Sequence, residues 1–453
     1  MKIIITTGIL SCMCGLAMAQ HDSLEITKPG FSENMQMNWC NGADRRSSPT
    51  LSGKYFTPTV MLDVNYTKSN NNPIDNTVVG STALARNNEV QVSAAHIGGD
   101  FQYANAHAHI VGQFGTRSTV IPRNDLSPYR GQYQLADAYR YLAEANAGYH
   151  FKVLRGMNID AGMFMSYIGL NSYYQVENWE YQASFTSDNT PWFFNGLRIQ
   201  LFVNQHLKIE PWIINGWQSY AMFNKQPGIG GNVTWLPNEN LKLLTNNYFG
   251  ADAMGLPNRK RFHTDNSLLW RYFHNGSKKI NQAAFSLTAD LGYEKGDGVN
   301  GFKSDPVKGP AQYFASIMFY HRIWFSKSKF AFTFGGGYMN NPGRYLVLAP
   351  AGQASPLPNI NNPSTSEGNF AFSANAGDKF EGADCSTNIE WLPNEHFSFR
   401  VEFVHRQSSV NYFAGRGGIT SSTGYSTLPT SNTWQPDLVK KENRIILVLL
   451  FRL

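Results

Sequence analysis

The residues of this chain that are most able to do chemistry are charged side chains in segments that alternate between polar and apolar residues. Successive side chains of an extended segment point to opposite faces, so these charges would share one face of each segment. Such a face could select ions through its electric field, or its charges could pair with one another and make the structure rigid. Both signs occur, so no strong ion selectivity is imposed. The candidates are Arg140, Glu144, Asp160, Arg198, Lys208, Glu210, Arg322, Glu390, Arg400 and Glu402.

A second group of candidates lies in the segment 170–192, where acidic and aromatic residues are interleaved. These candidates are Glu177, Trp179, Glu180 and Asp188. If the neighbouring segments form the wall of a pore, this loop could fold inward and narrow it. The alternatives are an ordinary surface loop or an aromatic lid, and the longer segment 340–382 competes as a plug.

Patterns typical of catalysis or metal binding are weak. His107 and His109 could place two ligands on one face of a strand, but no further ligands follow at a defined spacing, so a polar wall is favoured over a metal site. The chain has no nucleophile elbow and no metalloprotease motif. Cys40 and Cys385 are too isolated to form a disulfide framework or a zinc site. We therefore expect that the protein is not an enzyme and that it binds no cofactor.

The composition excludes several classes of protein. Charged residues make up only 15% of the chain and hydrophobic residues 42%, whereas aromatic residues make up 14%. A disordered chain would contain fewer aromatic residues, and a helical membrane protein would need several apolar runs of about 20 residues. The net charge of +6 is spread along the chain, so nucleic acid is not an expected partner. This composition suits a β-rich protein that faces two different solvents.

Alternation with a period of two residues is the dominant pattern of the chain. The segments 159–167, 282–293 and 397–406 show it clearly. Each run covers about 9–13 residues, the length that a tilted strand needs to cross a bilayer. The segment 135–147 is rich in helix-forming residues, but its alternation favours a strand.

The alternation predicts sixteen strands, which are separated by connections of two kinds. The strands are centred near residues 62, 92, 108, 142, 163, 199, 211, 232, 246, 269, 287, 318, 334, 388, 402 and 448. Seven short turns are expected near 98–99, 150–157, 204–206, 236–240, 275–279, 326–329 and 392–396. Eight long loops alternate with them. Outer-membrane barrels have short periplasmic turns and long extracellular loops.

A short repeated sequence supports this assignment of turns. The sequence Trp235-Leu-Pro-Asn-Glu239 recurs as Trp391-Leu-Pro-Asn-Glu395, each time between two alternating segments. Pro and Asn favour a tight turn because Pro presets φ and Asn tolerates the left-handed region. A Trp beside such a turn would lie at the membrane interface.

The N-terminus resembles a secretory signal peptide, because a basic start and an apolar segment precede the small-residue sequence Ala17-Met-Ala19. We expect cleavage near Ala19. The expected division of the chain is a signal peptide at 1–19, a polar segment at 20–56 that is a periplasmic tail or a lumen plug, and a barrel at 57–453.

A closed β-barrel explains the composition and the alternation together. In hydrocarbon every backbone N–H and C=O must be paired, and a closed sheet pairs them without leaving an edge. Only every second residue then faces lipid, while the others face the lumen and can be polar. We therefore expect an all-β fold, a transmembrane antiparallel β-barrel of about 16 strands surrounded by outer-membrane lipid.

One stretch adds a resemblance to a known family. Its features are the small-residue strand 157–169, the polar loop with Asn178, Ser184 and Pro191, then Gly196, Asn215-Gly-Trp217, Trp235-Leu-Pro237 and Gly250-Ala-Asp252. With these features the stretch from Tyr139 to Trp270 resembles the OmpL-like β-barrel porin family. The resemblance implies an outer-membrane porin and carries no catalytic residues.

Taken together, these observations favour a porin that forms a passive channel for small hydrophilic solutes or ions. The alternative is a plugged outer-membrane barrel that serves binding, adhesion or assembly through its long loops, and an outer-membrane hydrolase is less favoured. Trimers are common among porins, but no feature of the sequence indicates a subunit interface, so a homo-oligomer stays an open alternative.

Overall fold

The computed structural model describes residues 51–122, 132–133, 135–303, 311–342, 345, 379–425 and 436–453. The expected signal peptide, nearly all of the polar segment 20–56 and nearly all of the expected plug 340–382 therefore lie outside the described residues.

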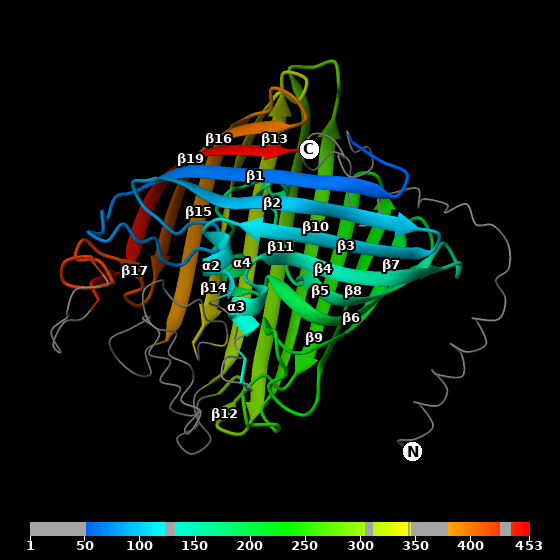
Figure 1. Cartoon of the computed structure of the whole chain (residues 1–453). Coiled ribbons are helices and arrows are strands. Elements are labelled where there is room, and N and C mark those ends of the chain that lie inside the picture. The colour runs from blue at the N-terminus through cyan, green and yellow to red at the C-terminus, as the bar shows by residue number, and fades with distance from the viewer. Residues whose placement is uncertain are drawn as a thin grey trace.

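The described chain is a closed antiparallel β-barrel, so the expected fold class is confirmed (Figure 1). Apart from the two-residue strand β12, which only extends β11, sixteen strands form the wall. They are β1 (Phe56–Ser69), β2 (Val90–Tyr103), β3 (Ala106–Phe114), β4 (Leu142–Phe151), β5 (Met157–Met165), β6 (Phe193–Phe202), β7 (Leu207–Ile214), β8 (Gly228–Asn238), β9 (Leu241–Gly250), β10 (Lys260–His274), β11 (Ile280–Gly296), β13 (Tyr313–Phe325), β14 (Phe330–Asn341), β15 (Phe380–Trp391), β16 (Phe397–Ser408) and β19 (Lys441–Arg452).

The barrel closes where the first strand meets the last. β1 pairs with β2 on one side and with β19 on the other, and Met61 lies opposite Arg452. Figure 1 shows β1 between these two neighbours. Each of the other wall strands pairs with the strand before it and the strand after it, so the described wall has no free edge.

The connections alternate in length as expected, with seven short turns and eight long loops. One expected turn is wrong, because Gly98 and Gly99 lie inside β2 and the turn is at Ala104–Asn105. These glycines serve close pairing of strands: a Cβ on Gly98 would lie 2.0 Å from the carbonyl oxygen of Ile110. Ala104 adopts a φ of 50°, which a two-residue hairpin turn requires.

The segment 135–147 is only partly a strand, which corrects the expectation. Leu135–Tyr139 forms the short helix α3, and β4 begins at Leu142. The helix precedes the part of the segment that pairs with β3, so local helix propensity decides its conformation. The other short elements are α2 (Arg117–Val120), η2 (Gln175–Glu177), α4 (Phe185–Asn189), β12 (Val299–Asn300), β17 (Phe413–Ala414) and β18 (Leu438–Val439).

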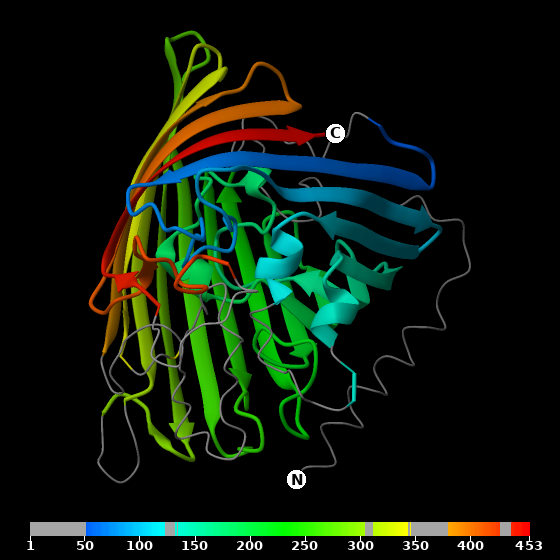
Figure 2. The same ribbon diagram turned by 60° about the vertical axis from the view of Figure 1, so that its left-hand side comes forward.

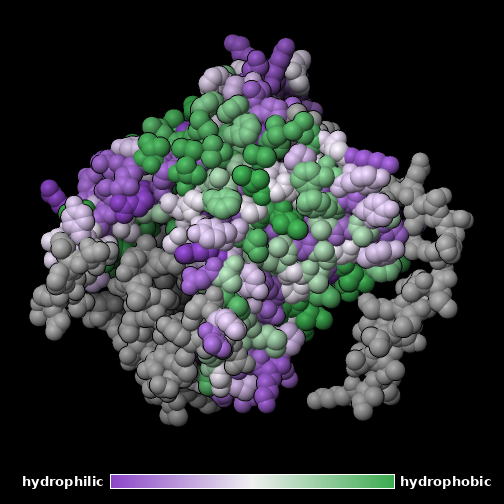
Figure 3. Space-filling view, viewed as in Figure 1, coloured by the Kyte–Doolittle hydropathy of each residue, from purple (hydrophilic) through white to green (hydrophobic). Residues whose placement is uncertain are grey.

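The two faces of the wall differ as the alternation predicts. On β16, Val401 is 52% exposed on the outer face, whereas its neighbour Glu402 is fully buried on the inner face. Figure 3 shows apolar side chains gathered on the outer surface over β1, β16 and β19. Among the described residues, no helix has the length and apolar character of a membrane span.

Exposed aromatic side chains lie near both ends of the strands. Trp235, Trp270 and Trp391 lie near the short turns, and Tyr338 lies near the long loops. Aromatic side chains prefer the membrane–water interface because their rings are amphipathic. The two groups therefore mark the two borders of the apolar band.

The interior of the barrel contains side chains from the loops as well as from the wall. Ile446 and Leu450 on the inner face of β19 pack in one buried cluster with Leu84, Tyr181 and Trp192 from the loops. A second cluster joins Phe185 and Tyr412 to Trp212 of β7. Figure 2 shows the short helices lying within the wall of strands.

Candidate functional site

The connection between β5 and β6, residues 166–192, folds into the barrel, and we call it the inner loop. It contains η2 and α4, and all five side chains of α4 are buried. Ser184 caps this helix, because its hydroxyl accepts a hydrogen bond of 3.0 Å from the N–H of Ser187.

Carboxylates of the wall hold one side of the inner loop through its backbone. Glu402 accepts hydrogen bonds from the N–H groups of Tyr181 and Gln182, at 2.7 and 2.8 Å. Asp384 on β15 accepts one from the N–H of Phe185 at 2.9 Å. These acidic side chains of the wall therefore position the backbone of the inner loop. A hydrogen bond from a backbone N–H to a carboxylate is stronger than one between two neutral groups.

The carbonyl oxygen of Trp179 is a further anchor, because it accepts hydrogen bonds from three wall strands. Nη1 of Arg322 donates at 3.2 Å, Oγ1 of Thr333 at 3.3 Å and Nδ2 of Asn388 at 3.0 Å. The Trp179 ring meets Trp324 edge to face, with the ring centroids 5.6 Å apart. This residue is therefore fixed against β13–β15.

Tyrosine hydroxyl groups attach the inner loop to further strands of the wall. Tyr181 donates to Asp63 of β1 at 2.7 Å, and Tyr174 donates to Glu144 of β4 at 2.9 Å. The loop is thus attached to both sides of the barrel and crosses its interior.

Asp188 joins the inner loop to the wall and to another loop. Its carboxylate lies 2.8 Å from Nη2 of Arg406 and accepts a hydrogen bond of 2.9 Å from the N–H of Thr82. Thr82 belongs to the loop between β1 and β2, so this ion pair connects three elements.

Most of the sequence-derived wall charges occur in pairs of opposite sign. Asp160 and Arg198 are 2.8 Å apart, and Lys208 and Glu210 are 2.7 Å apart. Glu390 contacts both Arg322 and Arg400, with Nε of Arg400 at 2.9 Å. Such pairs largely cancel one another's field at a distance.

Three of the candidates lie outside these ion pairs, and one of them is Glu402, which binds loop backbone instead. Arg140 lies between α3 and β4, outside the wall, and approaches Asp137 at 4.0 Å. The strand in which the sequence placed Arg140 begins only at Leu142. Glu144 does lie on a wall strand and has His109 Nε2 at 3.4 Å.

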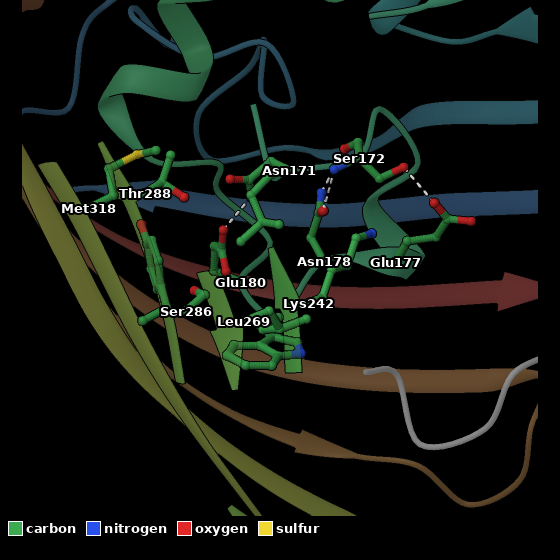
Figure 4. Close-up of a pocket in the computed structure, with 13 residues that line it drawn as sticks. Asn171, Ser172, Glu177, Asn178, Glu180, Lys242, Leu269, Ser286, Thr288 and Met318 are labelled. Carbon is green, nitrogen blue, oxygen red and sulfur yellow. Dashed lines mark hydrogen bonds between the residues drawn. The ribbon is translucent and has the colours of Figure 1, made fainter. Parts of the chain in front are cut away.

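A cavity of about 100 Å³ lies between the inner loop and the wall (Figure 4). The loop side includes Asn171, Glu177 and Glu180, and the wall side includes Lys242 and Thr288. The lining therefore combines both signs of charge with amide and hydroxyl groups. The wall strands that line it are β9, β10, β11 and β13.

The two glutamates of the cavity are hydrogen-bonded to neighbours in the same loop. Oγ of Ser172 donates to Glu177 at 2.6 Å, and the side-chain amide of Asn171 donates to Glu180. Burial raises the pKa of Glu180 above its ordinary value, while the Asn171 hydrogen bond opposes this shift. Figure 4 shows both contacts.

Comparisons with known proteins identify the family of the chain. A family model described as "Putative beta-barrel porin-2, OmpL-like" matches residues 56–430. The chain belongs to this porin family. The porin is therefore an outer-membrane protein, and the resemblance seen in its sequence is confirmed. A comparison with curated proteins finds no match.

Solved outer-membrane proteins have similar barrels at low sequence identity. OmpT of Vibrio cholerae has 8% identity and a TM-score of 0.48, with 90% of this chain and 100% of that chain covered. The channel DcaP of Acinetobacter baumannii has 9% identity and a TM-score of 0.48, with coverages of 88% and 97%. An anion-selective porin from Comamonas acidovorans has 8% identity and a TM-score of 0.48, with coverages of 88% and 99%. These values are too low to transfer a substrate.

Sequence reasoning missed the wall side of the cavity. Lys242, Ser286 and Thr288 are polar residues on the inner faces of their strands. Lys242 is an even number of residues from Asn246, and Ser286 and Thr288 are an even number from Asp290, so the alternation indicates that they face the lumen. Which of the many inner-face residues line the cavity depends on where the inner loop lies, and that is a property of tertiary packing.

The histidines considered as metal ligands have carboxylate partners in the porin. His107 lies 2.6 Å from Asp160, and His109 lies 2.7 Å from Asp100. Within the described ranges, no group of three or more His, Cys, Asp or Glu side chains is arranged to hold a metal ion.

Proposed function

We propose that the porin is a passive channel for small hydrophilic solutes or ions, and that the cavity beside the inner loop is its narrowest part. The observation that carries this proposal is the polar lining of that cavity between the loop and β9–β13. Glu177 and Glu180 would line the constriction, while Trp179 and Asp188 would hold the loop in place. Solutes would follow their concentration gradient without any bond being broken.

Weak ion selectivity is the expected consequence of this lining. Lys242 lies on the wall opposite Glu177 and Glu180, so the narrow region presents both signs of charge. The paired charges elsewhere on the wall add little net field. Small hydrophilic solutes of either sign would therefore pass.

The ends of the chain complete the proposal. Residues 1–19 would be removed as a signal peptide during export, and residues 20–56 would form a periplasmic tail or lie in the lumen. The barrel itself would be the channel, with or without association into a homo-oligomer.

The test is the conductance of the purified porin in a planar bilayer with a salt gradient. Discrete current steps are expected. The substitution Glu177→Gln should shift the reversal potential towards anion preference, and Lys242→Gln should shift it towards cation preference. Glu395→Gln and Lys278→Gln remove matched charges in exposed turns and should leave the potential unchanged. Steps that are absent in several preparations would contradict the proposal.

A plugged barrel is the second candidate, and one observation favours it. The loops place large apolar side chains, including Tyr181, Phe185 and Trp192, in buried clusters inside the barrel. Such packing would suit a barrel that presents its long loops for binding or adhesion. Absence of conductance in the porin, together with conductance after deletion of the inner loop, would favour this candidate.

A further inference from the structure

Four lysines lie together at the end of the barrel that carries the short turns. Lys278 and Lys279 belong to the turn between β10 and β11, and Lys327 and Lys329 belong to the turn between β13 and β14. All four are exposed. Because β11 pairs directly with β13, the two turns are neighbours on the rim of the barrel. We call these four residues the turn lysine cluster.

Hydrogen bonds hold the two turns side by side. The N–H of Ser326 donates to the carbonyl oxygen of Lys279 at 2.9 Å. The N–H of Ser328 donates to Oδ1 of Asn281, also at 2.9 Å. Ser326, Lys327 and Ser328 all adopt positive φ values, between 56° and 60°. Such a left-handed run costs free energy in residues other than glycine, and the hydrogen bonds between the turns offset this cost. The contact between the turns therefore fixes where the lysines of the cluster begin.

The positive charge of the cluster is not paired within the described part of the chain. None of its four lysines forms an ion pair there, and no Asp or Glu occurs within residues 272–283 or 323–333. The acidic residues of the two flanking turns contact other groups. Glu239 lies 3.4 Å from Nη2 of Arg271, and Glu395 lies 3.6 Å from Nε2 of His396. The cluster therefore offers its charge to a partner outside the protein.

A row of apolar side chains lies directly beside the cluster on the outer face. Ile280 pairs with Phe325, and Phe325 pairs with Phe330, in one line across β11, β13 and β14. Lys279 directly precedes Ile280, and Lys329 directly precedes Phe330. The two turns lie at the top of Figure 1, and Figure 3 shows hydrophilic side chains at the top of the same view with apolar side chains below them.

This arrangement fits the border between the apolar core of a membrane and its headgroups. Phe330 pairs with Trp391, one of the aromatic residues that mark the turn-side border of the apolar band. The lysines lie beyond this border, at the level of the lipid phosphates. A lysine can lay its apolar stem along such a border while its ammonium group contacts a phosphate. Short turns of outer-membrane barrels are periplasmic, so the cluster faces the inner leaflet.

Other turns offer less positive charge. Among the seven short turns, all of which the structure describes, one more carries exposed Lys or Arg, with Lys152 and Arg155 between β4 and β5. The turns on either side of it, at 104–105 and 203–206, contain neither Lys nor Arg. That part of the rim therefore gathers half the charge of the cluster.

We propose that the turn lysine cluster binds the headgroup of an anionic phospholipid of the inner leaflet, with the acyl chains of the lipid against Ile280, Phe325 and Phe330. The ammonium groups supply both hydrogen-bond donors and positive charge to the phosphate. Clusters of basic residues at a membrane surface attract anionic lipids for the same reason. The site lies outside the lumen, so this proposal does not depend on the proposed function.

The first test is a titration of the detergent-purified porin with phosphatidylglycerol, followed by native mass spectrometry. The wild type should bind phosphatidylglycerol in preference to zwitterionic phosphatidylethanolamine. The combined substitutions Lys278→Gln, Lys279→Gln, Lys327→Gln and Lys329→Gln should weaken this binding about tenfold or more. A change in gel mobility on boiling would show that each variant still forms a barrel.

Two further variants show whether the charge of this particular cluster is responsible. Lys152→Gln with Arg155→Gln removes exposed turn charges elsewhere on the rim and should change the binding little. Arg at all four positions of the cluster keeps the charge and should keep the preference for phosphatidylglycerol. A wild type without this preference, a four-Gln variant that binds as the wild type does, an equal loss in the control, or a loss in the Arg variant would overturn the proposal.

The second test separates a lipid from other anions. Inorganic phosphate and soluble glycerol phosphate carry a phosphate group without acyl chains, so neither should displace phosphatidylglycerol from the wild type at equal concentration. Displacement by either compound would show that the cluster binds any small anion and would overturn the proposal. Tighter binding of an acidic peptide or of peptidoglycan fragments than of phosphatidylglycerol would overturn it as well.

Discussion

At the scale of single residues, the buried carboxylates of the wall act mainly as anchors. Glu402 accepts from two backbone N–H groups of the inner loop, and Asp384 accepts from a third. A buried N–H needs a partner, so each carboxylate determines where the loop can lie. The shape of the lumen therefore depends on a few inward-facing acids.

Glu402 gives the sharpest prediction at this scale. Glu402→Ala leaves the buried N–H groups of Tyr181 and Gln182 without acceptors, which costs roughly 1–3 kcal/mol for each unsatisfied group. The inner loop should loosen, and single-channel current should become larger and noisier. Glu402→Gln retains one acceptor and should give a smaller effect, while Glu395→Gln in an exposed turn should give none. Currents of Glu402→Ala that match the wild type would show that other contacts position the loop.

At the scale of elements, the sequence predicted the wall far better than the interior. Period-two alternation located all sixteen strands because lipid and lumen demand different side chains on the two faces. The sequence did not predict the turn at Ala104–Asn105. A pair of glycines is typical of a turn, but Gly98 and Gly99 instead allow close pairing of strands. The helix Leu135–Tyr139 was missed because alternation was weighed above local propensity.

The candidate site was predicted less completely than the strands. The acidic and aromatic character of the inner loop pointed to Glu177 and Glu180, but nothing local pointed to Lys242 on the facing wall. The contacts that fix Trp179 connect residues more than 140 positions apart, and no local pattern encodes them.

The repeated turn sequence gives a prediction about elements. Asn394 Oδ1 accepts from the N–H groups of His396 and Phe397, at 2.8 and 3.0 Å, and Asn238 Oδ1 accepts from the N–H of Asn240 at 2.9 Å. Asn394→Ala should therefore destabilise the turn between β15 and β16 by about 1 kcal/mol.

Equilibrium unfolding in urea would measure this effect after refolding into lipid or detergent. Asn394→Asp keeps the acceptor and serves as the control, and it should stay near the wild type. A free energy of unfolding that is unchanged in Asn394→Ala would mean that the turn is set by the flanking strands alone.

At the scale of the whole molecule, closure of the sheet predicts unusual resistance to detergent. The wall strands satisfy one another's backbone groups all the way around, so sodium dodecyl sulfate finds no edge at which to start unfolding. Without heating, the porin should migrate differently on a denaturing gel from the boiled protein. A chain that ends at residue 440 lacks β19 and should show no such shift. A truncated chain that kept the shift would contradict closure through the pairing of β1 with β19.

The pairing of β1 with β19 also affects the order in which the chain is made and folds. Ribosomes make β1 early and β19 last, so the two strands that must meet are separated in time by the synthesis of nearly the whole protein. Contacts between such distant segments form slowly because the loop they close is long. Until the final dozen residues arrive, β1 and β16 each lack one neighbour and could pair with other chains. The unfinished chain must therefore be protected from pairing with other chains during export.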